Sequence, residues 1–114
     1  MGIVRDKYFY EEIFIEKKNS AEELSGNLTQ TRTRFEEEFA KSSAKKKYLL
    51  IENCNYQDIV DGNYNTQYNS KSYLGSIHSF NHKYNLEIVF MPNPEYTPIF
   101  IFGVFNYYLR NLLK

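Results

Sequence analysis

Three short apolar runs, separated by stretches with helical spacing, most constrain the fold of this chain. The runs cover residues 13–15, 48–51 and 88–90 and are rich in Ile, Leu, Val and Phe. Runs of this kind and length are typical of strands that are buried on both faces. Strands that alternate with helices need crossover connections, which place helices on the faces of a parallel sheet. The sequence therefore predicts an α/β sandwich with a central, mainly parallel sheet, in the order β-α-α-β-α-α-β-α.

The helices are predicted from their caps and from the spacing of aromatic residues. Ser20 with Glu23 three residues later is typical of a capping box at the start of a helix. Phe35 and Phe39 lie four residues apart and mark one face of a second helix. For residues 1–11 we predict only a short extended segment. We expect the first strand at residues 12–17. The predicted helices cover about residues 20–26, 32–44, 55–60, 70–84 and 98–113.

Length and composition fit one domain over residues 1–114. The 14 basic and 14 acidic residues give a formal net charge of zero, so any binding of nucleic acid must depend on a local patch. The single cysteine, Cys54, has no partner for an internal disulfide, which fits a reducing compartment. The chain lacks a signal-peptide pattern and an apolar run long enough to span a bilayer. We therefore expect a cytoplasmic protein without a membrane partner.

The tail of the chain is apolar on nearly all sides. Residues 99–113 predict a helix with Pro98 in its first turn, although the β-branched start leaves a strand over residues 98–102 as an alternative. A helix that is apolar all round is buried all round, and a small domain covers only one of its faces. We therefore expect a homodimer through the helix over residues 99–113.

Glu16 and Lys18 are the first candidates for a functional site. Side chains alternate along a strand, so these two residues point to one face and Lys17 points to the other. A carboxylate can bind a divalent metal ion, and an adjacent ammonium can orient a water molecule or stabilise negative charge on a phosphate. For these residues alone, a solvated charge cluster at the end of a strand is the simpler interpretation.

Other polar residues have both a functional and a structural interpretation. Arg32 and Arg34 could contact phosphates, or they could be the solvated start of a helix. Glu52 ends the strand over residues 48–51, and ligands gather at the carboxyl ends of strands in open α/β sheets. It could equally accept backbone hydrogen bonds in the following turn. Glu22 lies in the first turn of a helix, where the helix dipole favours a carboxylate.

Four segments together resemble XPF-type nuclease domains of the PD-(D/E)XK superfamily. These domains are found in structure-specific endonucleases of eukaryotes and archaea and in small phage and bacterial proteins. Residues 15–22, Ile-Glu-Lys-Lys-Asn-Ser-Ala-Glu, resemble the signature Glu-Arg-Lys-x-x-x-Asp. Residues 31–39, 48–53 and 71–77 resemble the family's Arg-rich helix, its Leu-Leu-Ile-Glu strand and its Lys-Ser-hydrophobic-x-Gly-Ser segment. The segments follow the family's order over residues 13–114.

The resemblance implies a three-layer, restriction-endonuclease-like fold and an endonuclease that uses Mg²⁺ or Mn²⁺ on branched or flapped DNA. By position, Glu16 would be a metal ligand and Lys18 would position the attacking water. Glu22 would replace the catalytic Asp of the signature. Lys17 would replace its Arg and contact DNA, without the bidentate fork of arginine. Arg32 and Arg34 would also contact DNA.

The chain departs from the family pattern upstream of Glu16. Family members carry a Gly-Asp-Tyr motif whose Asp is a metal ligand, and this motif is absent here. Asp6 or Glu52 would have to complete the metal site. The alternative is a catalytically silent protein of nuclease fold that binds DNA or a protein partner, such as a phage protein acting in the host cytoplasm.

Overall fold

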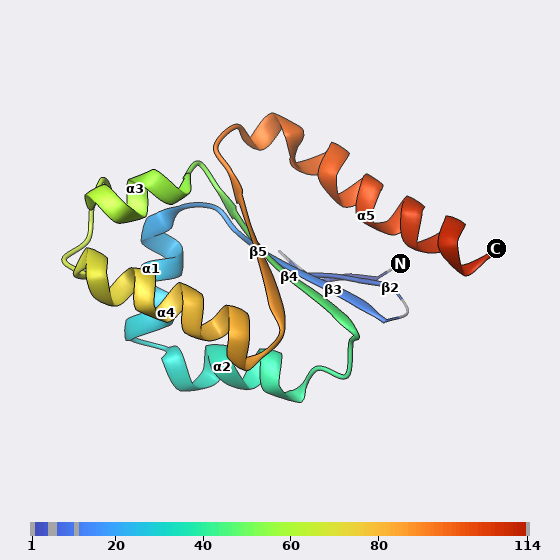
Figure 1. The fold of residues 1–114 in the computed structure, drawn as a ribbon, viewed down its shortest axis with the longest axis horizontal. Coiled ribbons are helices and arrows are strands. Elements are labelled where there is room, and N and C mark those ends of the chain that lie inside the picture. Colours follow the sequence, from blue (N-terminus) through green and yellow to red (C-terminus); the bar gives the residue numbers. More distant parts are fainter. Residues whose placement is uncertain (1, 5–6, 11, 114) are drawn as a thin grey trace.

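The chain folds into one mixed β-sheet with helices on both faces (Figure 1). The computed structural model describes residues 2–4, 7–10 and 12–113, and the side chains of residues 7–9 and 12–113. The strands are β1 Gly2–Val4, β2 Lys7–Tyr10, β3 Ile13–Lys18, β4 Lys46–Glu52 and β5 Leu86–Met91. The helices are α1 Ala21–Thr29, α2 Arg32–Lys41, α3 Tyr56–Asp61, α4 Ser70–Lys83, the 3₁₀ turn η1 Pro94–Tyr96 and α5 Thr97–Leu112.

The described strands lie side by side in chain order, β1-β2-β3-β4-β5. β1, β2 and β3 pair antiparallel, and β3, β4 and β5 pair parallel. The α/β architecture predicted from the sequence is confirmed, but the sheet is mixed rather than mainly parallel. The difference comes from the N-terminal segment, because β1 and β2 form an antiparallel extension where we expected only a short extended piece. The predicted strands and helices follow this extension in their predicted order.

The caps define most helix starts. Ser20 Oγ accepts a hydrogen bond from the Glu23 backbone N–H at 3.1 Å, and the Glu23 carboxylate accepts one from the Asn19 N–H at 2.7 Å. The predicted N-cap is confirmed, and the returning bond reaches Asn19 instead of Ser20. α1 continues through Gly26 to Thr29, three residues beyond its predicted end. Asn55 caps α3 through a reciprocal pair of bonds with Asp58.

Two apolar cores lie on the two faces of the sheet. The larger core fills the space between the sheet and α1–α4, where the rings of Phe35, Phe39 and Phe80 pack against one another with centroids 5.1 to 6.2 Å apart. Aromatic rings at these separations add to the stabilisation from burial alone. The smaller core lies under α5 and consists of Ile13, Ile15, Leu50, Ile101 and Phe105.

α5 covers the second face of the sheet alone. Its helical geometry excludes the strand alternative for residues 98–102. As expected for a small domain, the chain by itself covers only one face of this helix, where Ile101 and Phe105 are buried, and leaves the opposite side exposed. The exposed large side chains of α5 and its C-terminal end are Ile99, Phe102, Tyr107, Leu112 and Leu113. Whether a second chain covers them stays a prediction.

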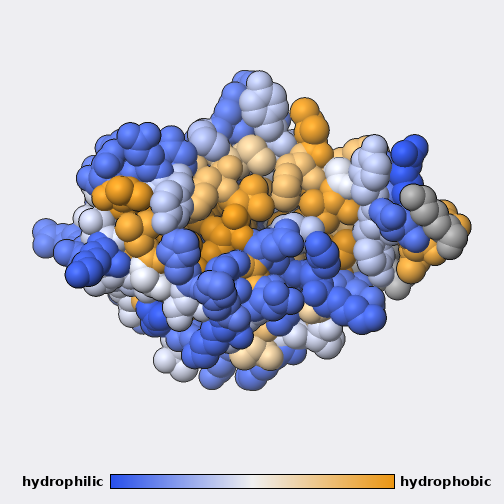
Figure 2. Space-filling model, in the orientation of Figure 1, coloured by the Kyte–Doolittle hydropathy of each residue, from blue (hydrophilic) through white to orange (hydrophobic). Residues whose placement is uncertain are grey.

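The surface between α5 and the other helices is apolar. Figure 2 shows an apolar band that runs across the middle of this face, between the layer of α3 and α4 and the layer of α5. β5 ends the sheet on this side, and its residues Ile88, Val89, Phe90 and Met91 are only half-buried. Within the described residues, no helix has both the length and the apolar character needed to cross a membrane.

Candidate functional site

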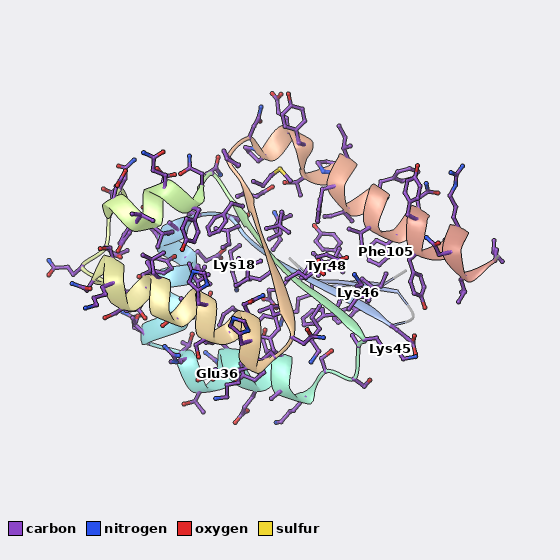
Figure 3. All side chains as sticks on the ribbon, in the orientation of Figure 1. Lys18, Glu36, Lys45, Lys46, Tyr48 and Phe105 are labelled. Carbon is purple, nitrogen blue, oxygen red and sulfur yellow. The ribbon has the colours of Figure 1, made fainter. Side chains whose placement is uncertain are left out.

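β3 brings Glu16 and Lys18 together on the face that packs against α1, α2 and α4. The strand alternates, so Phe14 on the same face belongs to the large core, while Ile13 and Ile15 belong to the core under α5. The Lys18 Nζ lies 3.2 Å from the Glu16 Oε1. Glu16 is only 2% exposed. In Figure 3, Lys18 lies on the side of the sheet covered by α1 and α4, and Phe105 lies on the α5 side.

β2 and α2 contribute two more charged side chains. Lys7 is the antiparallel partner of Glu16 across β2 and β3, so both side chains lie on one face. The Lys7 Nζ lies 3.3 Å from Glu38 Oε1, and the Glu38 side chain contacts Glu16 from α2. The Lys18 Nζ lies 5.0 Å from the centre of the Phe35 ring. We call Lys7, Glu16, Lys18 and Glu38 the carboxylate cluster.

In the carboxylate cluster, Glu16 has a raised pKa, and two carboxylate oxygens lack hydrogen-bond partners among the described residues. Burial first, and then the contact with the Glu38 side chain, raise the pKa of Glu16 from 4.5 to about 7, against the opposing charge of Lys18. Each carboxylate has a lysine on its Oε1. The Oε2 atoms of Glu16 and Glu38 are buried and have no hydrogen-bond partner among the described residues. Two buried acceptor atoms of this kind carry a free-energy cost unless a proton or a cation joins them.

Lys17 and Glu52 lie on the opposite face of the sheet. The Lys17 Nζ is 3.4 Å from Glu52 Oε1, and Thr97 donates its hydroxyl to Glu52 Oε2 at 2.5 Å. These groups form the polar end of a pocket of about 630 Å³ between the sheet and α5. The sheet thus separates Glu52 from Glu16, and the expectation that Glu52 completes a metal site with Glu16 is wrong. Asp6, the other residue expected to complete that site, lies outside the described residues.

Glu22 and Arg32, two of the other predicted site residues, have structural partners, and Arg34 is exposed. Glu22 Oε2 accepts a hydrogen bond from the Asn65 backbone N–H at 2.8 Å and so holds the loop between α3 and α4. Arg32 pairs with Glu36 at 3.2 Å and donates to Ser76 Oγ at 2.8 Å, which ties α2 to α4. Arg34 is exposed and lines a shallow pocket of about 340 Å³ with residues 29–33. Of the two arginines, Arg34 is the better placed to contact an external phosphate.

Glu38 was not predicted as a site residue. It lies between Phe35 and Phe39, the two residues that identify the buried side of α2, and this position could have drawn attention to it. The described residues contain no group of three or more His, Cys, Asp or Glu side chains that could bind a metal ion. The carboxylate cluster offers two carboxylates with unpartnered oxygens, which fits a cation that also keeps water or phosphate ligands, as Mg²⁺ does.

A scan against protein-family models finds no match to this chain, and a search of curated proteins finds no significant relative.

Proposed function

We propose that this protein is a metal-dependent endonuclease that acts on branched or flapped DNA. The observation that carries the proposal is the carboxylate cluster, where Glu16 and Lys18 lie side by side at 3.2 Å and a second carboxylate contacts Glu16. A carboxylate pair with an adjacent lysine matches the requirements of phosphodiester hydrolysis. The sequence resemblance to XPF-type nuclease domains supports the same chemistry and a restriction-endonuclease-like interpretation of the three layers.

Each residue of the proposed site has a separate task. Glu16 would hold Mg²⁺ or Mn²⁺, which when bound activates water and stabilises charge on the phosphate. Lys18 keeps its ammonium between Glu16 and the Phe35 ring, so it is held in place to donate to a phosphate oxygen or to orient a water molecule. Lys7 adds a second positive charge beside the carboxylates. Arg34 on α2 would contact the DNA backbone.

The proposed activity is tested with flap, fork and four-way junction DNA in Mg²⁺ or Mn²⁺. The wild-type protein is compared with Glu16→Gln, which keeps the size of the side chain and removes its charge. We expect cleavage that falls at least about a hundredfold in this variant, the loss typical of a group that acts in the transition state. The matched control is Glu37→Gln, because Glu37 is an exposed residue of α2 that pairs only with Lys41 among the described residues. Equal cleavage by wild type and Glu16→Gln would contradict the proposal.

A second candidate function is a catalytically silent protein that binds DNA or a protein partner. The specific observation in its favour is the burial of Glu16, together with the position of Lys18 against Phe35. Neither residue lines the pockets of about 630, 340, 610 and 470 Å³ on the described part of the chain. DNA binding without cleavage, unchanged in Glu16→Gln, would favour this function over the endonuclease.

A further inference from the structure

We propose that Glu38 of α2 joins Glu16 as the second carboxylate ligand of a divalent-cation site, a proposal that rests on the proposed function for its role in DNA cleavage. The metal ligands expected from the sequence do not include Glu38. Of the expected partners of Glu16, Glu52 is on the other face of the sheet and Glu22 binds Asn65, while Asp6 lies outside the described residues. Among the described residues, Glu38 contributes a carboxylate that contacts Glu16.

The partners of the four carboxylate oxygens indicate where the cation binds. Glu16 Oε1 faces Lys18 at 3.2 Å and Glu38 Oε1 faces Lys7 at 3.3 Å. The remaining oxygens, Oε2 of both residues, are buried and lack a hydrogen-bond partner within the described residues. Glu16 is only 2% exposed, so bulk water does not solvate its Oε2. A cation bound by both Oε2 atoms would relieve this unfavourable arrangement.

The position of Glu38 on its helix supports a functional role. It lies on the side of α2 marked by the buried Phe35 and Phe39, where a charged side chain costs free energy unless it is paired. The Glu38 side chain is about 30% exposed and pairs with Lys7, but its Oε2 is buried beside the Glu16 carboxylate, and two carboxylates in contact repel each other. A cation bound between the two carboxylates would offset this repulsion.

The charges of the carboxylate cluster predict the class of cation and its affinity. Two carboxylates and two lysines sum to zero, so a divalent ion leaves a net charge of about +2 in the cluster, and a phosphate group would balance it. Carboxylate oxygens select hard cations such as Mg²⁺ and Mn²⁺, which keep water and phosphate ligands. We expect weak binding of the metal ion alone and tighter binding when DNA is present.

The test is direct binding of Mn²⁺ to the whole protein, measured by the electron paramagnetic resonance signal of free Mn²⁺ at pH 8. We expect saturable binding by wild type, a loss of affinity of at least about tenfold in Glu38→Gln and in Glu16→Gln, and wild-type affinity in Glu37→Gln. Circular dichroism of each variant confirms that it is folded. A folded Glu38→Gln that binds Mn²⁺ as wild type does would overturn the proposal, as would wild-type protein that binds no Mn²⁺ with or without a non-cleavable DNA.

The binding test separates this inference from the proposed function. Mn²⁺ binding that needs both carboxylates, in a protein that cleaves no DNA, would support the cation site and reject the endonuclease. DNA cleavage that depends on Glu16 but not on Glu38, with Mn²⁺ binding unchanged in Glu38→Gln, would support the endonuclease and reject Glu38 as a ligand.

Discussion

At the scale of single residues, the buried carboxylate of Glu16 links stability to pH. Its pKa lies above that of an exposed glutamate because burial outweighs the attraction of Lys18, and Glu38 adds to the shift. Lys7 faces the pair from β2 and opposes the shift. A carboxyl group with a raised pKa in the folded state favours folding while it is protonated. Its ionisation then disfavours folding as the pH rises.

We predict that Glu16→Gln stabilises the metal-free protein at alkaline pH. Because the pKa rises from 4.5 to about 7 on folding, the free energy of unfolding of wild type should fall as the pH rises from about 4.5 to 7. Above pH 7 wild type has lost the whole contribution of this titration to its free energy of unfolding. That contribution is roughly 3 kcal/mol at most by the usual conversion of a pKa shift to free energy. The Gln variant lacks this titration, so its stability should change less over the same range. Urea unfolding at pH 5 and pH 8 in EDTA measures the effect. Parallel pH profiles of the two proteins would contradict it.

The sequence predicted one half of the carboxylate cluster. Glu16 and Lys18 are two residues apart on one strand, and alternation alone places them on one face. Glu38 is distant in the chain, and its contact with Glu16 depends on how α2 lies over the sheet, which local spacing does not determine. Glu52 was expected near Glu16, but the face to which it points depends on the register of β4 against β3, where Glu16 pairs with Leu49. Whether residues on two neighbouring strands point to the same face depends on the register in which the strands pair, and tertiary structure determines that register.

At the scale of elements, local caps contribute measurably to the fold. Ser20 connects the end of β3 to α1, and its hydroxyl accepts from the Glu23 N–H at 3.1 Å. We predict that Ser20→Ala lowers the free energy of unfolding by about 1 kcal/mol, the usual cost of removing an N-cap side chain. The matched control is Ser43→Ala, an exposed serine in the loop between α2 and β4. Guanidinium unfolding of both variants measures the difference. An equal effect of the two substitutions would argue against the cap.

Elements with strong local patterns were predicted well, and elements without them were not. β3, β4, β5 and the amphipathic helices follow from apolar runs and from aromatic spacing. β1 and β2 are three and four residues long, and the pairing of β1 with β2 and of β2 with β3 depends on contacts across the sheet. α1 passes Gly26 because its buried residues Leu24 and Leu28 continue to face the core. Packing of this kind outweighs the low helix propensity of one glycine.

At the scale of the whole molecule, the two faces of the sheet are covered unequally. Among the described residues, helices α1 to α4 cover one face and α5 covers the other (Figure 1). The outer side of α5 leaves Phe102 70% exposed and Ile99 67% exposed. Large apolar side chains that cluster on one surface are typical of an interface. This surface supports the proposal of a homodimer through α5.

We predict that Phe102→Glu shifts the protein from dimer to monomer. A carboxylate in an apolar interface would lose its hydration without a partner. The stability of each chain should change little, because Phe102 contributes little to the core of its own chain. Val60→Glu on α3 is the control, since Val60 is an exposed apolar residue away from α5. Sedimentation velocity over a range of concentrations measures the masses. Wild-type protein that stays monomeric at high micromolar concentration would exclude the dimer.

The sequential order of the strands has a consequence for how this protein is made. Each described strand after the first pairs with the one before it in the chain, so no position in the sheet waits for a segment from far downstream. A nascent chain leaves the ribosome from its N-terminus, at a pace slow compared with the formation of a hairpin. The antiparallel strands β1, β2 and β3 are synthesised before the other strands and can pair first, and β4 and β5 then add to the sheet one at a time. We expect the sheet to assemble during translation. α5 would then pack last, on the face of the sheet that stays exposed while the chain is still bound to the ribosome.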